Sequence, residues 1–202
     1  RISIDFVLKH IPGARDPFNG VHPWYVLFEI SSGQSEDAAR GLMESLFEIA
    51  NERELIRDAV ASETEAQRQA LWLLRESISA SQKPEGGSIK HDVSVPVAKV
   101  PAFLEKADKA VKERIPGIRV VSFGHLGDGN VHFHLRAPEG ASASEWDDTQ
   151  GKQISANVHD LVTQWGGSIS AEHGIGQMKR DELARLADPA VLTILRGVKQ
   201  AL

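Results

Sequence analysis

Alternating apolar and polar residues predict several short strands, because successive side chains of a strand point to opposite faces. The alternation begins at Ile2, Ile4 and Phe6, and it recurs where Val93 and Val95 flank a polar residue. The strands predicted in this way cover residues 2–9, 24–31, 55–60, 92–96, 118–123 and 131–136.

Apolar residues spaced three or four apart predict amphipathic helices in the remaining segments. Leu71, Leu74 and Ile78 form one such stripe, and Ser35 is a suitable N-cap for an earlier helix. The predicted helices cover residues 35–52, 63–81, 97–114 and 144–165, and two closing helices meet near Asp188-Pro189.

This mixture of strands and helices, which includes at least one hairpin, is typical of an α+β fold. We expect an antiparallel sheet with flanking helices, of the ferredoxin-like cap type, over residues 1–140. Residues 141–202 are expected to form a helical C-terminal segment that contains a glycine-rich loop.

Composition narrows the class of protein. The chain has 202 residues, of which 41% are hydrophobic and 25% charged, as in ordinary globular proteins. A net charge of −5 gives no electrostatic support for nucleic-acid binding. Cysteine is absent, which excludes disulfides and a thiolate zinc site.

No targeting or membrane segment is expected either. The sequence has no run of about 18 apolar residues and no visible signal or transit peptide. We therefore expect a cytoplasmic location, with the mitochondrial matrix as the alternative. Because the chain begins at Arg1, we interpret it as a piece of a longer protein or as a chain with a disordered front end.

The segment GHLGDGNVHFH holds the densest candidate chemistry. If Asp128-Gly129 is a two-residue hairpin turn, His125 lies opposite His132, with Cβ atoms roughly 4.5–5.5 Å apart. Two imidazoles at that distance can share one metal ion, and alternation places His134 on the same face as His132. The alternative is a solvent-facing hairpin with ordinary polar residues, and a longer loop would shift the register.

A second cluster lies in the glycine-rich loop GGSISAEHGIG, residues 166–176. Glu172 offers an anionic metal ligand, and His173 offers a base that titrates near neutral pH. Two histidines and a glutamate are a known catalytic-metal pattern with open coordination positions. The alternative is a helix-capping loop with a solvated Glu and His.

A third group, Arg75, Ser79 and Lys90, predicts an anion site. Arg75 and Ser79 are four residues apart on a predicted helix and share a face. Arginine can hold a carboxylate by two parallel hydrogen bonds, and lysine adds a point charge. The alternative is that these are ordinary solvated side chains.

Four segments together resemble one known family. GHLGDGNVH and SAEHGIGQMK resemble two signatures of the C-terminal domain of the FAD-linked oxidases, and WLLRE and KHDVSVP resemble two further blocks. That family includes D-2-hydroxyglutarate dehydrogenases, D-lactate dehydrogenases and the flavin subunit of glycolate oxidase. The resemblance covers nearly the whole chain, from Phe6 onward.

The resemblance implies a metal site with a neighbouring base. His125, His132 and Glu172 match the positions of the family's metal ligands, usually for zinc or manganese. His173 matches the catalytic base. Other enzymes that use such a set, the metal-dependent hydrolases, are one alternative, and a non-catalytic anion-binding module is another.

The resemblance also implies the substrate contacts. Arg75, Ser79 and Lys90 match residues that bind the substrate carboxylate, with Ser79 at a position that is often Thr. His134 stands where D-2-hydroxyglutarate dehydrogenases usually have Asn, which leaves one substrate contact open. Two cations for one carboxylate suggest a diacid such as 2-hydroxyglutarate or malate.

The implied reaction is FAD-dependent oxidation of a D-2-hydroxy acid, such as D-2-hydroxyglutarate or D-lactate, to the 2-oxo acid. In the family an FAD-binding domain precedes this one, and we expect it to be absent from this chain, which alone would be inactive. Further expected partners are an electron-acceptor protein or quinone and a second copy of the chain in a homodimer.

Overall fold

The computed structural model describes the backbone of residues 1–141 and 143–202, and their side chains except at 143–145, 147–150 and 152. The chain divides into two compact units, 1–84 and 85–202. The division expected at residue 140 stays a prediction, and the helical segment after it belongs to the same compact unit as the sheet. Val158 and Val162 of that segment lie in one core with the strands, which explains this grouping.

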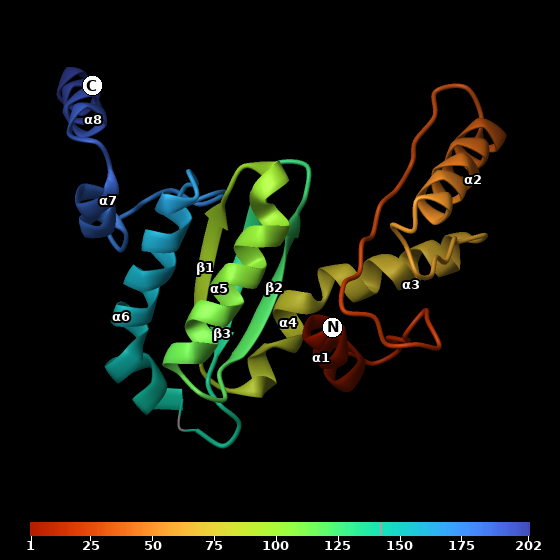
Figure 1. The fold of residues 1–202 in the computed structure, drawn as a ribbon, viewed down its shortest axis with the longest axis horizontal. Coiled ribbons are helices and arrows are strands. Elements are labelled where there is room, and N and C mark those ends of the chain that lie inside the picture. Colours follow the sequence, from red (N-terminus) through yellow and green to blue (C-terminus); the bar gives the residue numbers. More distant parts are fainter. Residues whose placement is uncertain (142) are drawn as a thin grey trace. The chain divides into compact units, whose positions relative to one another are not determined.

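The first unit consists of helices joined by loops (Figure 1). Ser35 caps the second helix by accepting a hydrogen bond from Ala38, as predicted. A capping box of Thr64 and Gln67 begins the third. The elements of this unit are α1 (Ile2–His10), α2 (Glu36–Glu52), α3 (Glu65–Glu76) and α4 (Ile78–Ser81), followed by the short 3₁₀ helix η1 (Lys83–Glu85).

The strand predicted over residues 2–9 is wrong, since this segment is helix α1. Its buried residues are Ser3, Phe6 and Val7, a spacing of three and four that fits a helix packed against α3 and α4. The apolar pattern of Ile2 to Phe6 also fits a strand, so alternation alone could not separate the two structures.

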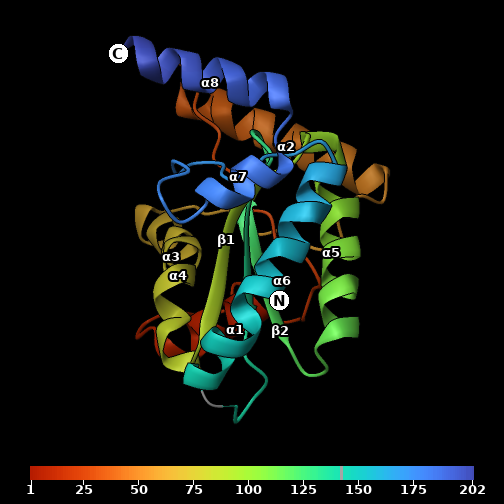
Figure 2. The same cartoon turned by 90° about the vertical axis from the view of Figure 1, so that its left-hand side faces the viewer.

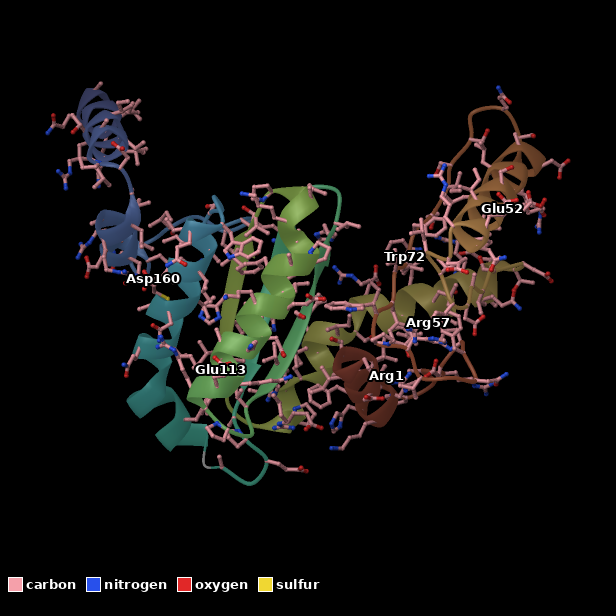
Figure 3. The ribbon with its side chains drawn as sticks, in the orientation of Figure 1. Arg1, Glu52, Arg57, Trp72, Glu113 and Asp160 are labelled. Atoms are coloured by element: carbon pink, nitrogen blue, oxygen red, sulfur yellow. The ribbon has the colours of Figure 1, made fainter. Side chains whose placement is uncertain are left out.

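The strands predicted over 24–31 and 55–60 are also wrong, since neither segment forms a helix or strand. The first is held by side chains. Glu29 accepts hydrogen bonds from Trp72 (2.8 Å) and Arg68 (3.2 Å) of α3, and Trp72 is labelled in Figure 3. The predicted helix 63–81 is present but divided at Ser77, between α3 and α4.

The second unit contains an antiparallel sheet of three strands in the order β1-β3-β2, with helices packed against it. This confirms the predicted α+β class and the last three predicted strands. Its elements are β1 (Ser88–Ser94), η2 (Val97–Lys99), α5 (Val100–Arg114), β2 (Arg119–His125), β3 (Asn130–Arg136), α6 (Ala143–Gln164), α7 (Arg180–Leu186) and α8 (Pro189–Ala201).

The glycine-rich loop stands where a fourth strand would complete the sheet. Ser168 forms an antiparallel bridge with Ser94, on the edge of β1 that β3 leaves free. The order of elements is therefore strand–helix–strand–strand–helix–strand, with the last strand reduced to one bridge. This is the ferredoxin-like arrangement that the sequence predicted.

One face of the sheet is apolar and covered by α5 and α6 (Figures 1 and 2). Val93 and Phe133 from the strands, Phe103 from α5 and Val158 from α6 are fully buried in this core. The period of two along each strand turns the intervening residues to the other face. That polar face carries the candidate site. Among the described residues, no helix is long and apolar enough to cross a membrane.

His91 is a buried polar residue on the apolar face. Its Nδ1 lies 3.0 Å from the carbonyl oxygen of Phe133, and its Nε2 lies 3.0 Å from Ser155 Oγ. Burial lowers the pKa of His91 to about 4, and nearby His159 and Lys179 act in the same direction. The hydrogen bond to Phe133 opposes this shift only in part, so His91 is neutral at pH 7.

We predict that the fold loses stability in mild acid through His91. Unfolded histidine titrates near 6.5 and the folded group near 4, so the unfolded chain binds more protons between these values. About 3 kcal/mol of stability, present above pH 6.5, should be lost as the pH falls towards 4. In His91→Asn, melting temperatures measured by circular dichroism at pH 7 and 5 should differ less than in the wild type. Equal differences would contradict this role.

Candidate functional site

The β2–β3 hairpin brings two of the predicted ligands to one face of the sheet. Its register pairs His125 with Asn130 and Phe123 with His132, so the predicted direct pairing of His125 with His132 is wrong. The loop has four residues, 126–129, rather than two. The observed register differs from the predicted one by two positions, so both histidines still lie on the predicted face.

Local contacts explain the longer loop. The Asp128 carboxylate accepts a hydrogen bond from the Asn130 amide at 2.8 Å, and Gly129 adopts φ +74°, which favours glycine. The carbonyl of Gly129 also accepts a hydrogen bond from the Val95 amide at 3.1 Å. The turn is thus fixed against the end of β1 as well as within itself.

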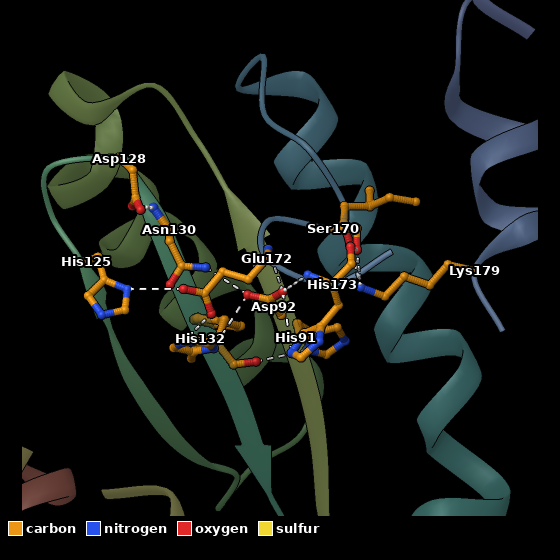
Figure 4. Close-up of polar contacts among 12 residues, drawn as sticks. His91, Asp92, His125, Asp128, Asn130, His132, Ser170, Glu172, His173 and Lys179 are labelled. Carbon is orange, nitrogen blue, oxygen red and sulfur yellow. Dashed lines mark hydrogen bonds and ion pairs between the residues drawn. The ribbon is translucent and has the colours of Figure 1, made fainter. Parts of the chain in front are cut away.

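The structure brings His125, His132 and Glu172 together (Figure 4). His125 Nδ1 lies 3.3 Å from Glu172 Oε1, and His132 Nε2 lies 3.5 Å from Glu172 Oε2. Ligand atoms of the three side chains all lie within 4.8 Å of one another, and they form the only such cluster found among the described residues. Two imidazoles and a carboxylate suit zinc or manganese.

The three side chains differ in their exposure to solvent. The His132 side chain is 16% exposed, whereas those of His125 and Glu172 are 55% and 44% exposed. The cluster therefore has one buried wall and one open side. An ion held there would keep coordination positions within reach of a small ligand.

The glycine-rich loop reaches the cluster by pairing with β1. The amides and carbonyls of Ser94 and Ser168 exchange hydrogen bonds of 3.0 and 2.9 Å, and the Ala171 amide donates to the Asp92 carbonyl at 3.2 Å. A Cβ on Gly167 would lie 2.0 Å from the Ser94 carbonyl oxygen and 2.9 Å from a methyl of Val162. Only glycine allows this close approach.

Lys179 holds the same loop in place by hydrogen bonds. Its Nζ donates to the Ile169 carbonyl at 2.8 Å and contacts Ser170 Oγ at 3.3 Å. The Ser170 hydroxyl in turn donates to the His173 carbonyl. Burial lowers the pKa of Lys179, against a smaller opposite effect of the Asp92 charge. Lys179 is the last residue of the segment SAEHGIGQMK, and it therefore has a structural role that the sequence did not reveal.

Asp92 is the site residue that sequence reasoning missed. Its buried carboxylate accepts hydrogen bonds from the Asn130 side chain and from the amides of Glu172 and His173. Burial alone would raise the pKa of Asp92, but the hydrogen bonds that it accepts outweigh burial and lower it. The alternation of side chains along β1 could have indicated Asp92, because it places Asp92 on the same sheet face as His132.

The predicted base and substrate contacts have different surroundings. His173 is 73% exposed beside Glu172, with Nε2 3.9 Å from Asp92 Oδ2. His134 is buried, and burial together with the charge of Lys90 lowers its pKa to about 3, so it is neutral. Lys90 is exposed and lies directly opposite His134 in the sheet.

Arg75 and Ser79 belong to the first compact unit. Arg75 is half-buried on α3, and Ser79 is exposed on α4, beyond the division at Ser77. Their role in binding substrate stays a prediction, as do those of Lys90 and His134.

Comparison with known proteins identifies the family. The model of the family described as "FAD linked oxidases, C-terminal domain" matches residues 1–202, the whole chain. The chain belongs to this family. The predicted resemblance is thereby confirmed.

Similar proteins of the family carry related names. A D-2-hydroxyglutarate dehydrogenase of Stutzerimonas stutzeri is 40% identical over 200 residues, which cover 96% of this chain and 42% of that protein. A mitochondrial D-2-hydroxyglutarate dehydrogenase of Arabidopsis thaliana is 30% identical, over 99% of this chain and 34% of its own length. A putative mitochondrial D-lactate dehydrogenase of Schizosaccharomyces pombe is 30% identical, over 93% and 36%. The chain thus spans less than half the length of these relatives.

We predict that Gly167→Ala displaces the loop from β1. The added methyl group would overlap the Ser94 carbonyl, and overpacking of this kind typically costs about 1–3 kcal/mol. The melting temperature should fall, and the cluster should bind added zinc more weakly. Gly174→Ala is the matched control in the same loop, since a Cβ there meets nothing within 4 Å. Identical melting and zinc binding in both variants would show that the close approach is unimportant.

Proposed function

We propose that this chain is the substrate- and metal-binding part of an FAD-dependent dehydrogenase that oxidises a D-2-hydroxy acid to the 2-oxo acid. The convergence of His125, His132 and Glu172 beside His173 is the observation that supports this most directly. Membership of the FAD-linked oxidase family and the names of its relatives support the reaction class.

The first part of the proposal is a divalent ion, zinc or manganese, bound by His125, His132 and Glu172. The donor set fits either metal, and the exposed side of the cluster leaves room for two substrate oxygens. Such an ion, when bound, acts as a Lewis acid that lowers the pKa of a substrate hydroxyl. The protein contributes the fixed positions of the three side chains.

The second part assigns proton transfer to His173. Its exposed imidazole can reach a substrate bound at the neighbouring cluster, and its amide is held by Asp92. His173 Nε2 accepts the proton of the substrate hydroxyl. FAD, which a part of the protein outside this chain would hold, would supply the acceptor for the hydrogen of the α-carbon and its electron pair. The substrate thereby loses two electrons and two hydrogens, which balances its conversion to the 2-oxo acid.

The third part assigns substrate carboxylates to Arg75, Ser79, Lys90 and His134. Lys90 supplies an exposed charge, and neutral His134 supplies a hydrogen bond beside it. Two cations, Arg75 and Lys90, favour a diacid such as D-2-hydroxyglutarate, the substrate named for the Stutzerimonas and Arabidopsis relatives. D-lactate, named for the Schizosaccharomyces relative, would leave the second carboxylate site empty.

The proposal also includes the remaining partners and the location. A reduced flavin needs an electron acceptor, for which we propose a protein or a quinone, and we propose a homodimer as the assembly. The bacterial relative suggests the cytoplasm and the plant relative the mitochondrial matrix as the location.

We predict that His132→Ala removes the metal from the full-length protein. The variant loses one of three ligands at the buried wall of the cluster, so metal content after dialysis should fall to a small fraction of the wild-type value. Elemental analysis measures this directly. His173→Ala serves as the control and should keep its metal. Full metal occupancy in His132→Ala would remove this residue from the ligand set.

We predict that His173→Ala slows catalysis although the protein keeps its metal. Loss of a general base typically lowers the rate about 10²–10⁴-fold, and no ligand is removed. Flavin reduction by D-2-hydroxyglutarate, followed by absorbance in a single turnover of the FAD-containing protein, should slow by that factor. A rate within about tenfold of the wild type would be too high for the assigned role.

A further inference from the structure

Asp92 joins the two segments that supply the metal ligands (Figure 4). Its Oδ1 accepts a hydrogen bond from Asn130 Nδ2 at 2.8 Å and lies 3.5 Å from His132 Nδ1, both on β3. Its Oδ2 accepts from the amides of Glu172 at 3.0 Å and His173 at 3.1 Å, both on the glycine-rich loop. One carboxylate thus contacts the hairpin with one oxygen and the loop with the other.

We propose that Asp92 is a positioning residue for the metal centre, which selects the metal-binding tautomer of His132 and fixes Glu172 and His173 beside it. This inference rests on the proposed function, because it assigns Asp92 a role at the proposed metal site. Asp92 itself does not bind the metal or the substrate in this scheme.

The tautomer of His132 follows from the chemistry of its two neighbours. A neutral imidazole carries one hydrogen, and the nitrogen that binds a metal must carry none. An ionised carboxylate only accepts, so Asp92 Oδ1 favours a hydrogen on Nδ1 of His132. Glu172 Oε2 lies equally far, 3.5 Å, from Nε2, but a bound ion would engage that carboxylate. Asp92 is then the acceptor that remains for His132, and Nε2 keeps its lone pair for the metal.

The distance of 3.5 Å between His132 Nδ1 and Asp92 Oδ1 is longer than an ordinary hydrogen bond. Such contacts in active sites are often long before a ligand binds. Histidine ligands commonly donate their second N–H to a carboxylate, and loss of that partner typically weakens metal binding about 10–100-fold.

The loop contacts give Asp92 its second task. The backbone carbonyl of Asp92 binds the Ala171 amide, and its side chain binds the next two amides along the chain. Three consecutive residues of the loop are therefore fixed to a single residue of β1. The positions of the Glu172 and His173 backbones above the sheet therefore depend on Asp92.

Asp92→Asn separates the two tasks. The amide oxygen of Asn can still accept from the Glu172 and His173 amides, which places its NH₂ group on the side of His132. That group donates to Nδ1 and favours a hydrogen on Nε2, the tautomer that cannot bind a metal there. The Asn130 side chain must turn so that its oxygen, rather than its NH₂ group, faces position 92. The loop should therefore stay in place while metal affinity falls.

The test uses full-length protein with ¹⁵N-labelled histidine, with and without zinc. In the zinc-loaded wild type, long-range ¹H–¹⁵N spectra should show His132 protonated on Nδ1, and in metal-free Asp92→Asn on Nε2. Titration with zinc or manganese should show affinity about 10–100-fold lower in the variant, with unchanged amide shifts for loop residues. Asp128→Asn is the matched control, since it removes a carboxylate near the hairpin whose one described side-chain hydrogen bond goes to the Asn130 amide.

Wild-type affinity and an Nδ1-protonated His132 in Asp92→Asn would overturn the proposal and leave the metal site standing. If the variant does not fold, the spectrum of the zinc-loaded wild type still decides, because an Nε2-protonated His132 there overturns the proposal without any substitution. Failure of the proposed function looks different. In that case the wild type would bind neither metal, whatever the tautomer of His132.

Discussion

The pairing of the glycine-rich loop with the free edge of β1 is the contact on which the rest of the site depends. The bridge between Ser94 and Ser168 is short, yet it brings a glutamate to a histidine that lies 40 residues earlier in the chain. The approach is close enough to require glycine at position 167. A regular fourth strand would continue to alternate along the edge, whereas the single bridge lets the chain turn over the polar face.

Strand β1 also separates two electrostatic environments. His91 and Asp92 are neighbours in sequence and point to opposite faces of the sheet. On the helix side, burial keeps His91 neutral, and the polar atoms are satisfied by a carbonyl and a hydroxyl. On the other side, hydrogen bonds keep Asp92 ionised although it is buried. The sheet thus places a fixed negative charge under the histidines without exposing it to water.

The parts of the fold that could be predicted from sequence are those with strong local signals. The Asp-Gly turn between apolar runs located the hairpin, and helical spacing located α5, α6 and the closing helices. Residues 2–9 were misassigned because their apolar positions fit both periods. The face shared by His125 and His132 was predictable, but their pairing was not, since it depends on contacts of Gly129 with β1. Asp92 was missed because its partners lie 38 to 81 residues away.

The alternation of side chains along β2 and β3 constrains how the turn between these strands can vary. A side chain changes face with every position along a strand, so a register shift by one would turn His125 away from His132 and would also turn the core-facing side chains of β2 away from the core. Insertions between these strands are therefore neutral for the site only when they lengthen the loop itself or move the register in pairs. A one-residue slip would therefore remove a histidine from the site and weaken the core at the same time.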